Sequence, residues 1–182
     1  MKRAIVEAAP LAPAALAEVK DWLGIHTPGE DVSLNVLLRA ALETCEAFTG
    51  TMPLSAECEE ILLVCSDWQK LQTQPVLSIT AVDGIAADGT RTPLPADAYA
   101  LDFRADGTGW VRLLNPGLAG RIAVRFSAGM ATDWSGLPEG LRHGIVRLAA
   151  HQYRARENGD KSALPPAAVA AVWRPWRSPR LL

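Results

Sequence analysis

Hydrophobic residues at helical spacing occupy both ends of this sequence, and short β-type runs occupy its middle. The helical spacing continues up to Gly50 and returns after Pro138. Between residues 57 and 127, runs rich in β-branched and aromatic residues alternate with turn residues such as the pair Asp106 and Gly107. This order predicts an α+β fold in which a small antiparallel sheet is inserted into a helical bundle.

The first predicted helix extends from Ala14 to Leu23, and Gly24 is a suitable C-terminal stop. Its apolar positions recur at helical spacing: Leu16, Val19, Trp22 and Leu23.

The second predicted helix starts at a capping box and ends at Gly50. Thr27 would accept a hydrogen bond from the backbone of Glu30, and the Glu30 side chain would reach back to the backbone of Thr27. The apolar stripe of this helix follows the i, i+3, i+4, i+7 rule: Leu34, Leu37, Leu38, Ala41, Leu42, Cys45 and Phe48.

Five strands are expected in the central region. They are Glu60–Ser66, Val76–Val82, Tyr99–Phe103, Trp110–Leu113 and Arg121–Phe126. The last strand alternates polar and apolar residues, which predicts that one of its faces is solvated. Glu57, Glu59 and Glu60 cluster near the start of the first strand, and we expect them to form a solvated edge that discourages strand pairing.

Two further helices and a tail follow the sheet. The long helix is predicted from Pro138 to about Glu157, and the short helix is predicted from Ala167 to Trp173 because Pro175 ends it. The remaining residues lack periodicity, so we expect an extended C-terminal arm. The chain is thus predicted to be a single domain of residues 1–182. Its segments are N-terminal helices in 1–56, a β insertion in 57–130, C-terminal helices in 131–173 and an arm in 174–182.

The charge distribution draws attention to the arm. The whole chain has a net charge of −2, which argues against a surface that grips nucleic acid throughout. Residues 131–182, however, carry 8 basic and 4 acidic residues, a net charge of +4. Trp and Arg are frequent in interface hot spots. We therefore predict a partner-docking arm formed by Trp173, Arg174, Trp176, Arg177, Arg180, Leu181 and Leu182. Packing of the tail on its own domain, or contact of the tail with nucleic acid, are the alternatives.

Catalysis, metal binding and cofactor binding are not expected. No GxSxG, Walker A, GxGxxG or HExxH motif occurs, so an enzyme would have to be of an unrecognised type. His143 and His151 lie two helical turns apart, too far to share one ion. The three cysteines, Cys45, Cys58 and Cys65, are odd in number and lack a CxxC pair, so we expect reduced and buried thiols.

The N-terminus imitates a signal peptide without completing one. Lys2 and Arg3 precede an alanine-rich stretch, but Glu7, Pro10 and Pro13 interrupt it. No apolar run approaches the roughly 18 residues that a membrane span needs. We expect a protein that is not secreted, stays in a reduced intracellular compartment and has no membrane partner.

Six blocks of this sequence resemble, in the same order, the head–tail connector (adaptor) proteins of tailed phages, including the related adaptors of gene transfer agents. The first block, LAEVKDWL at Leu16–Leu23, is similar to the opening of that family. Ala15, just before it, departs from the Ser or Thr that often caps the helix there. The six blocks span nearly the whole chain: Leu16–Leu23, Glu30–Gly50, Gln74–Ile79, Arg121–Gly129, Leu137–Tyr153 and Leu164–Ala167.

The resemblance implies a structural, non-enzymatic role in the neck of a phage or gene transfer agent particle. Such adaptors form a ring, commonly twelve-fold, under the portal at the capsid vertex, and the ring extends the DNA channel toward a stopper or tail. The implied partners are the portal ring, a stopper or tail-terminator protein and further copies of this chain. Double-stranded DNA would pass through the channel without sequence-specific contact, and the C-terminal arm would dock into the portal ring.

Besides an enzyme of unrecognised type, for which no motif speaks, two other functions remain open from the sequence. One is a different neck protein, either a stopper or a tail terminator. The other is a DNA-binding module that acts through the basic tail, whose binding would depend steeply on salt.

Overall fold

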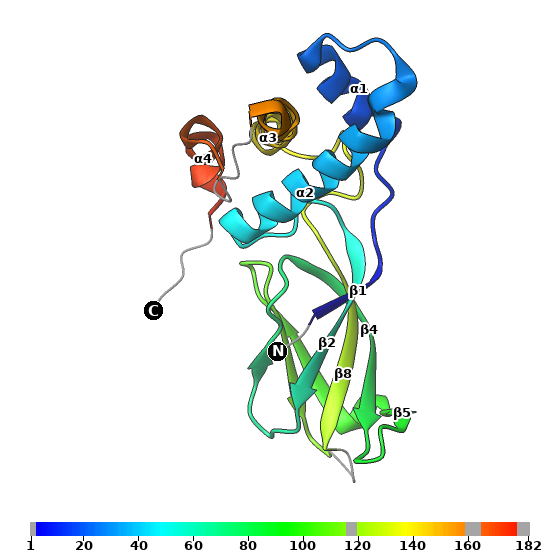
Figure 1. The fold of residues 1–182 in the computed structure, drawn as a ribbon. Coiled ribbons are helices and arrows are strands. Elements are labelled where there is room, and N and C mark those ends of the chain that lie inside the picture. The colour runs from blue at the N-terminus through cyan, green and yellow to red at the C-terminus, as the bar shows by residue number, and fades with distance from the viewer. Residues whose placement is uncertain (1–2, 116–119, 159–164, 178–182) are drawn as a thin grey trace. The chain divides into compact units, whose positions relative to one another are not determined.

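A computed structural model describes residues 3–115, 120–158 and 165–177 of the chain (Figure 1). The chain divides into two compact units. The sheet unit comprises Met1–Ala9 and Ser55–Met130, and the helical unit comprises Pro10–Leu54 and Ala131–Leu182. The α+β class with an inserted antiparallel sheet is confirmed.

The sheet unit contains two antiparallel sheets rather than one. The larger sheet has the strand order β1 (Arg3–Glu7), β2 (Ala56–Leu63), β8 (Arg121–Ala128), β4 (Val76–Ile85) and β5 (Arg91–Pro93). The smaller sheet has the order β3 (Gln69–Lys70), β7 (Gly109–Leu113) and β6 (Tyr99–Phe103), and a 3-10 turn at Ala96–Ala98 precedes β6.

The core of the sheet unit follows from the alternation along its strands. On β2 and β8, the pairs Cys58–Phe126 and Leu62–Ile122 lie opposite each other on the buried face. Arg121 and Arg125 are exposed on the other face of β8, as predicted, but Ala123 between them is buried, so that face is only partly solvated. Buried side chains of both sheets form the core: Cys58, Leu62, Leu71, Val82, Val111, Leu113, Ile122, Val124 and Phe126.

The prediction of a solvated glutamate edge is wrong for two of the three residues. β2 is an inner strand, because β1 pairs with it on the side away from β8. Glu59 is 9 % exposed and Glu60 is 1 % exposed. The Glu60 carboxylate accepts hydrogen bonds from the backbone N–H groups of Gln72 and Thr73, both at 2.9 Å, and from the Thr73 hydroxyl at 2.7 Å. These three bonds replace the water that the buried charge has lost.

The helical unit is built around its third helix. Its elements are α1 (Pro13–Leu23), a 3-10 turn at Pro28–Glu30, α2 (Asp31–Thr49), α3 (Glu139–Asn158), α4 (Ala167–Trp173) and a 3-10 turn at Arg174–Trp176. Helix α3 contacts α1, α2 and α4, and α2 also contacts α1 and α4. The buried stripe of α2 consists of Leu34, Leu38, Ala41, Cys45 and Thr49.

The starts of the first two helices differ from the prediction. Helix α1 begins at Pro13 after Ala12, so Ala15 lies inside the helix and is fully buried, where a Ser or Thr cap would have no role. The capping box does not form, since Thr27 makes no side-chain capping bond. The Glu30 carboxylate instead accepts a hydrogen bond from Arg156 on α3 at 3.2 Å.

None of the helices within the described residues combines the length and the apolar character that crossing a membrane requires.

Candidate interaction surfaces

The C-terminal segment begins with a tryptophan that belongs to the core of the helical unit. Trp173 has no exposed surface, and its indole N–H donates a hydrogen bond to the Leu141 carbonyl at 3.3 Å. Its ring lies 6.0 Å from the ring of Phe48 on α2. Gly144 on α3 makes room for the indole, because a Cβ at that position would overlap it. Trp173 therefore supports the fold and has no free surface for a partner.

The next residues of the predicted docking arm form a short turn on the helical unit. Arg174–Trp176, for which no regular structure was expected, is a 3-10 turn, and Trp176 is 36 % exposed. The Arg177 guanidinium lies 5.6 Å from the ring of Phe48. Of the arm residues, Arg180, Leu181 and Leu182 lie outside the residues that the structure describes. Docking of Arg174, Trp176 and Arg177 onto a partner remains a prediction.

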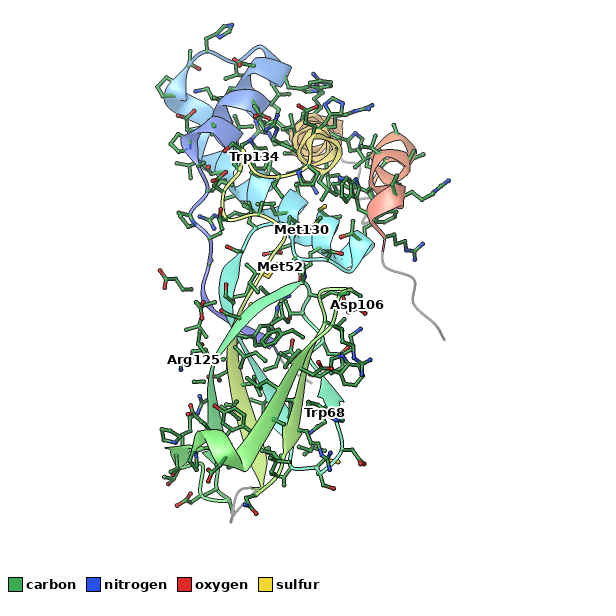
Figure 2. All side chains as sticks on the ribbon, turned by 180° about the vertical axis from the view of Figure 1, so that it is seen from behind. Met52, Trp68, Asp106, Arg125, Met130 and Trp134 are labelled. Atoms are coloured by element: carbon green, nitrogen blue, oxygen red, sulfur yellow. The ribbon has the colours of Figure 1, made fainter. Side chains whose placement is uncertain are left out.

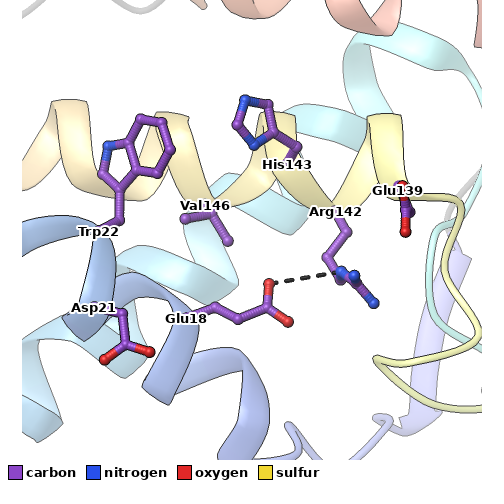
Figure 3. Close-up of a pocket in the computed structure, with 7 residues that line it drawn as sticks. All are labelled: Glu18, Asp21, Trp22, Glu139, Arg142, His143 and Val146. Carbon is purple, nitrogen blue, oxygen red and sulfur yellow. Dashed lines mark ion pairs between the residues drawn. The ribbon is translucent and has the colours of Figure 1, made fainter.

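Two surface hollows lie along α3 in the helical unit and share Trp22 as a lining residue, and we call the two together the α3 groove. One end of this α3 groove is lined by α1 and the start of α3, through Glu18, Asp21, Trp22, Glu139, Arg142, His143 and Val146 (Figure 3). The other end is lined by α3 and the start of α4, through Arg147, His151, Arg154, Pro166, Ala168 and Val169, and again by Trp22. Trp22 thus lies between the two ends.

The two ends of the α3 groove carry opposite charge. The acidic end is lined by Glu18, Asp21 and Glu139 and by one arginine, Arg142, whose Nε lies 3.6 Å from a Glu18 oxygen (Figure 3). No ion pair with another described residue is found for Asp21 or Glu139. At the other end, cationic side chains predominate, and no carboxylate lines it. The groove therefore offers a segregated charge pattern to a partner.

Two aromatic side chains, Trp22 and His143, contact each other in the middle of the α3 groove. Trp22 is 45 % exposed and meets His143 edge-on, with the ring centroids 5.3 Å apart. Deeper in the helical unit, the Trp134 indole N–H donates a hydrogen bond to Glu18 at 3.1 Å, which fixes that carboxylate at the rim (Figure 2). A half-exposed Trp with fixed charges beside it is typical of a protein-binding surface.

A second polar cluster lies on the outer face of the large sheet. Glu59 on β2 accepts two hydrogen bonds from Arg91 on β5, at 2.8 and 2.9 Å, and lies 3.7 Å from Arg125 on β8 (Figure 2). The paired guanidinium of Arg91 lowers the pKa of the Glu59 carboxyl below its usual value. This cluster ties three strands together.

The histidines and cysteines occupy separate places. His143 and His151 are both exposed along the α3 groove, and no group of three or more His, Cys, Asp or Glu side chains within residues 3–115, 120–158 and 165–177 could hold a metal ion. Burial raises the pKa of the Cys45 thiol to about 12, so this thiol stays protonated. Cys58 is buried as well, whereas Cys65 is partly exposed, which corrects the expectation that all three are buried.

Among known proteins, similarity to this chain is found in solved structures. No protein-family profile and no curated protein sequence matches the chain. A chain in the neck of an empty gene transfer agent (GTA) particle, computed with C6 symmetry, is 31 % identical with a TM-score of 0.80, over 100 % of this chain and 98 % of that chain. The chain belongs to the family of structural neck proteins of GTA particles.

Two further structures agree with this assignment. A chain in the virion of the native GTA particle is 31 % identical to this neck protein with a TM-score of 0.77. A chain in the neck of the native particle, computed with C12 symmetry, is 30 % identical with a TM-score of 0.79. Each match covers 100 % of this neck protein and 98 % of the other chain.

Sequence reasoning missed the α3 groove of this neck protein. Trp22 was assigned to the apolar face of the first helix with Val19, but only Val19 is buried. A usable signal was present on α3, where the polar residues His143, Arg147, His151 and Arg154 recur at helical spacing opposite the apolar stripe. The sequence did not show that α1 and α4 lie on either side of this row of polar residues.

Proposed function

We propose that this neck protein is the adaptor of its particle. It forms a ring of identical subunits under the portal, extends the DNA channel and links the capsid vertex to the stopper or tail. The observation that carries the proposal is the match over the whole chain to neck chains computed with C6 and with C12 symmetry, because both symmetries fit a ring of identical subunits. Twelve copies are what the resemblance to connector proteins implies. The six sequence blocks in connector order support the same assignment.

The charge of the chain fits a channel wall. A wall along which DNA slides must not hold phosphates tightly, and strong binding would need a clear excess of Lys and Arg. The chain has a net charge of −2. DNA would then pass without sequence-specific contact.

We further propose that residues 1–182 act as one connector domain that contains both units. The chain passes between the units after Ala9, after Leu54 and after Met130. Because the chain passes between them three times, the two units alternate along the sequence and are not neighbours joined by one linker.

The decisive experiment measures the mass of the full-length protein, alone and mixed with its portal ring, by mass photometry. We expect subunits to join the portal directly as a stoichiometric ring. A protein that joins the portal only when another neck protein is already bound is a stopper, and this result would overturn the adaptor assignment. Binding to duplex DNA with a salt slope of about −0.9 per phosphate, without portal binding, would support the DNA-binding alternative.

The docking arm needs a separate test that leaves Trp173 in place. We propose that Arg174, Trp176 and Arg177, together with Arg180, Leu181 and Leu182, contact the portal. Deletion of residues 178–182 combined with R174E and R177E is expected to weaken portal binding. The matched control R121E changes an exposed arginine of the sheet unit. Unchanged portal binding by the arm variant would show that the arm has another role.

A further inference from the structure

We propose that the outward face of α2 in one subunit binds in the α3 groove of the next subunit around the ring. This inference rests on the proposed ring and names the two surfaces that close it. The partner is a second copy of this chain, and both surfaces lie in the helical unit.

The outward face of α2 is unusually apolar for a solvated helix. Val32 is 79 % exposed, more than any other large apolar side chain within the described residues, and Val36 is 61 % exposed. Arg39 follows one turn later on the same face, is exposed, and forms no ion pair with another residue that the structure describes. We call Val32, Val36 and Arg39 the α2 ridge. Exposed apolar pairs beside an unpaired charge are typical of surfaces that a partner covers.

The α2 ridge and the α3 groove lie on opposite sides of the helical unit. Helix α2 packs against α3 through its buried stripe, so its ridge points away from α3. The α3 groove lies on the solvent side of α3, which is the side away from α2. A ring built from head-to-tail contacts needs two different patches on opposite sides of each subunit, with a turn of about 30° between neighbours for twelve copies. The helical unit meets this requirement.

The charges and spacings of the two surfaces are complementary. If Val36 lies against Trp22 at the middle of the groove, then Arg39, about 4.5 Å further along α2, reaches the acidic end formed by Glu18, Asp21 and Glu139. There it supplies the cation that Asp21 and Glu139 lack within the described residues.

The same register fits the length of α3. Glu139 begins α3 and lies about 6 Å along that helix from His143, the residue that contacts Trp22. Glu43, the next exposed residue of α2 after Arg39, lies about 10 Å beyond Val36 and therefore extends past the start of α3. It does not meet the acidic end.

Cysteine cross-linking tests the contact directly. In a C65S background, where the remaining thiols of Cys45 and Cys58 are buried, the double variant V36C/H143C is assembled on the portal ring and oxidised. Because each chain carries both positions, a ladder of covalent multimers is expected on a denaturing gel. The matched control A47C/H143C uses an exposed α2 position three turns away from Val36 and should give no ladder.

Charge reversal gives an independent readout. R39E is expected to raise the concentration that half-saturates the portal ring by about tenfold, because it places a fourth carboxylate at the acidic end. Adding D21K in the same chain should restore most of that loss. R121E, in the sheet unit, should have no effect.

The outcomes separate this inference from the function on which it rests. A wild-type protein that forms no ring overturns the proposed function and the inference together. A normal ring in which V36C/H143C gives no ladder and R39E assembles like the wild type overturns the inference alone. A ladder from A47C/H143C but not from V36C/H143C overturns the proposed register.

Discussion

The sheet unit and the helical unit each bury polar groups, but they use them differently. In the sheet unit, the buried Glu60 carboxylate accepts three hydrogen bonds and holds Gln72 and Thr73 in the connection between β3 and β4. In the helical unit, Trp173 anchors α4 because its indole ring fills the space beside Gly144. The indole N–H donates one hydrogen bond, to the Leu141 carbonyl. At these two positions, hydrogen bonds to a buried carboxylate hold a loop of the sheet unit, whereas the volume of a buried indole holds a helix of the helical unit.

This difference has an energetic consequence. A buried carboxylate is stabilising only while all of its donors remain, because each orphaned partner carries the full cost of desolvation. A buried indole loses stability in proportion to the cavity that its removal leaves. The two units should therefore respond to different kinds of substitution, and the predictions below test this from the largest effect to the smallest.

The largest loss is expected from W173A. Removing a fully buried Trp should lower the free energy of unfolding by about 3–5 kcal/mol, because α4 loses its anchor on α2 and α3. Hydrogen exchange should rise in peptides of α3 and α4 and stay unchanged in peptides of β2 and β8. W176A, at a partly exposed position three residues later, is the control and should cost under about 1 kcal/mol. Equal losses for the two variants would contradict the core role of Trp173.

E60Q is expected to cost about 1–3 kcal/mol, because an amide offers one acceptor oxygen where the carboxylate offers two, and one donor of the loop at Gln72 and Thr73 is left unpaired. Chemical denaturation measures the loss, and exchange should rise in the peptide from β3 to β4. E57Q on the same strand, at a position that is not fully buried, is the control. A neutral E60Q would show that the sheet unit does not depend on this carboxylate.

E59Q should cost about 1 kcal/mol at pH 7, through the loss of the paired bonds from Arg91. The pKa of Glu59 is lowered in the folded protein, so its contribution is fully present above the ordinary carboxyl pKa of 4.5 and is lost as the pH falls through the folded value. The stability difference between wild type and E59Q should therefore shrink in acid. A difference that is constant from pH 7 to pH 3 would argue against the ion pair.

The smallest expected effect concerns the reactivity of the three cysteine thiols and not the stability of the fold. In the native protein, a thiol reagent such as Ellman's reagent should label Cys65 quickly, because this thiol is partly exposed. Cys45 and Cys58 should react only after unfolding, since both are buried and the pKa of Cys45 is about 12. C65S should show no fast-reacting thiol. Fast labelling of Cys45 would mean that the α2 face of the helical core opens readily.

Helices and strands were predictable wherever the hydrophobic pattern was long or where turn residues and prolines marked the ends of the element. The strand Tyr99–Phe103 and the helix Ala167–Trp173 match the prediction residue for residue. β1 was missed because its five residues are all exposed, so no buried periodicity marks this strand, which pairs with β2. β3 and β5 are too short to leave a pattern.

The candidate surfaces were harder to predict, since they depend on which elements become neighbours. The Trp and Arg content of the C-terminal segment was visible in the sequence, but its composition did not reveal that Trp173 is buried under Phe48 and beside Gly144. The β2 glutamates were misjudged for the same reason. Their charges suggested solvent, whereas Arg91 and the backbone at Gln72 and Thr73, distant in sequence, supply their partners.

The insertion of the sheet unit also sets an order of events during synthesis. The residues of the sheet unit end at Met130, so all of its strands emerge from the ribosome before α3 does. Helices α1 and α2 emerge much earlier, but the buried stripe of α2 is not covered until Trp173 and α3 emerge, and α3 begins about 90 residues after α2 ends. The nascent chain therefore carries a folded sheet unit while the Leu34, Leu38 and Cys45 face of α2 is still open. That interval is when this protein is most exposed to misassociation and to chaperones.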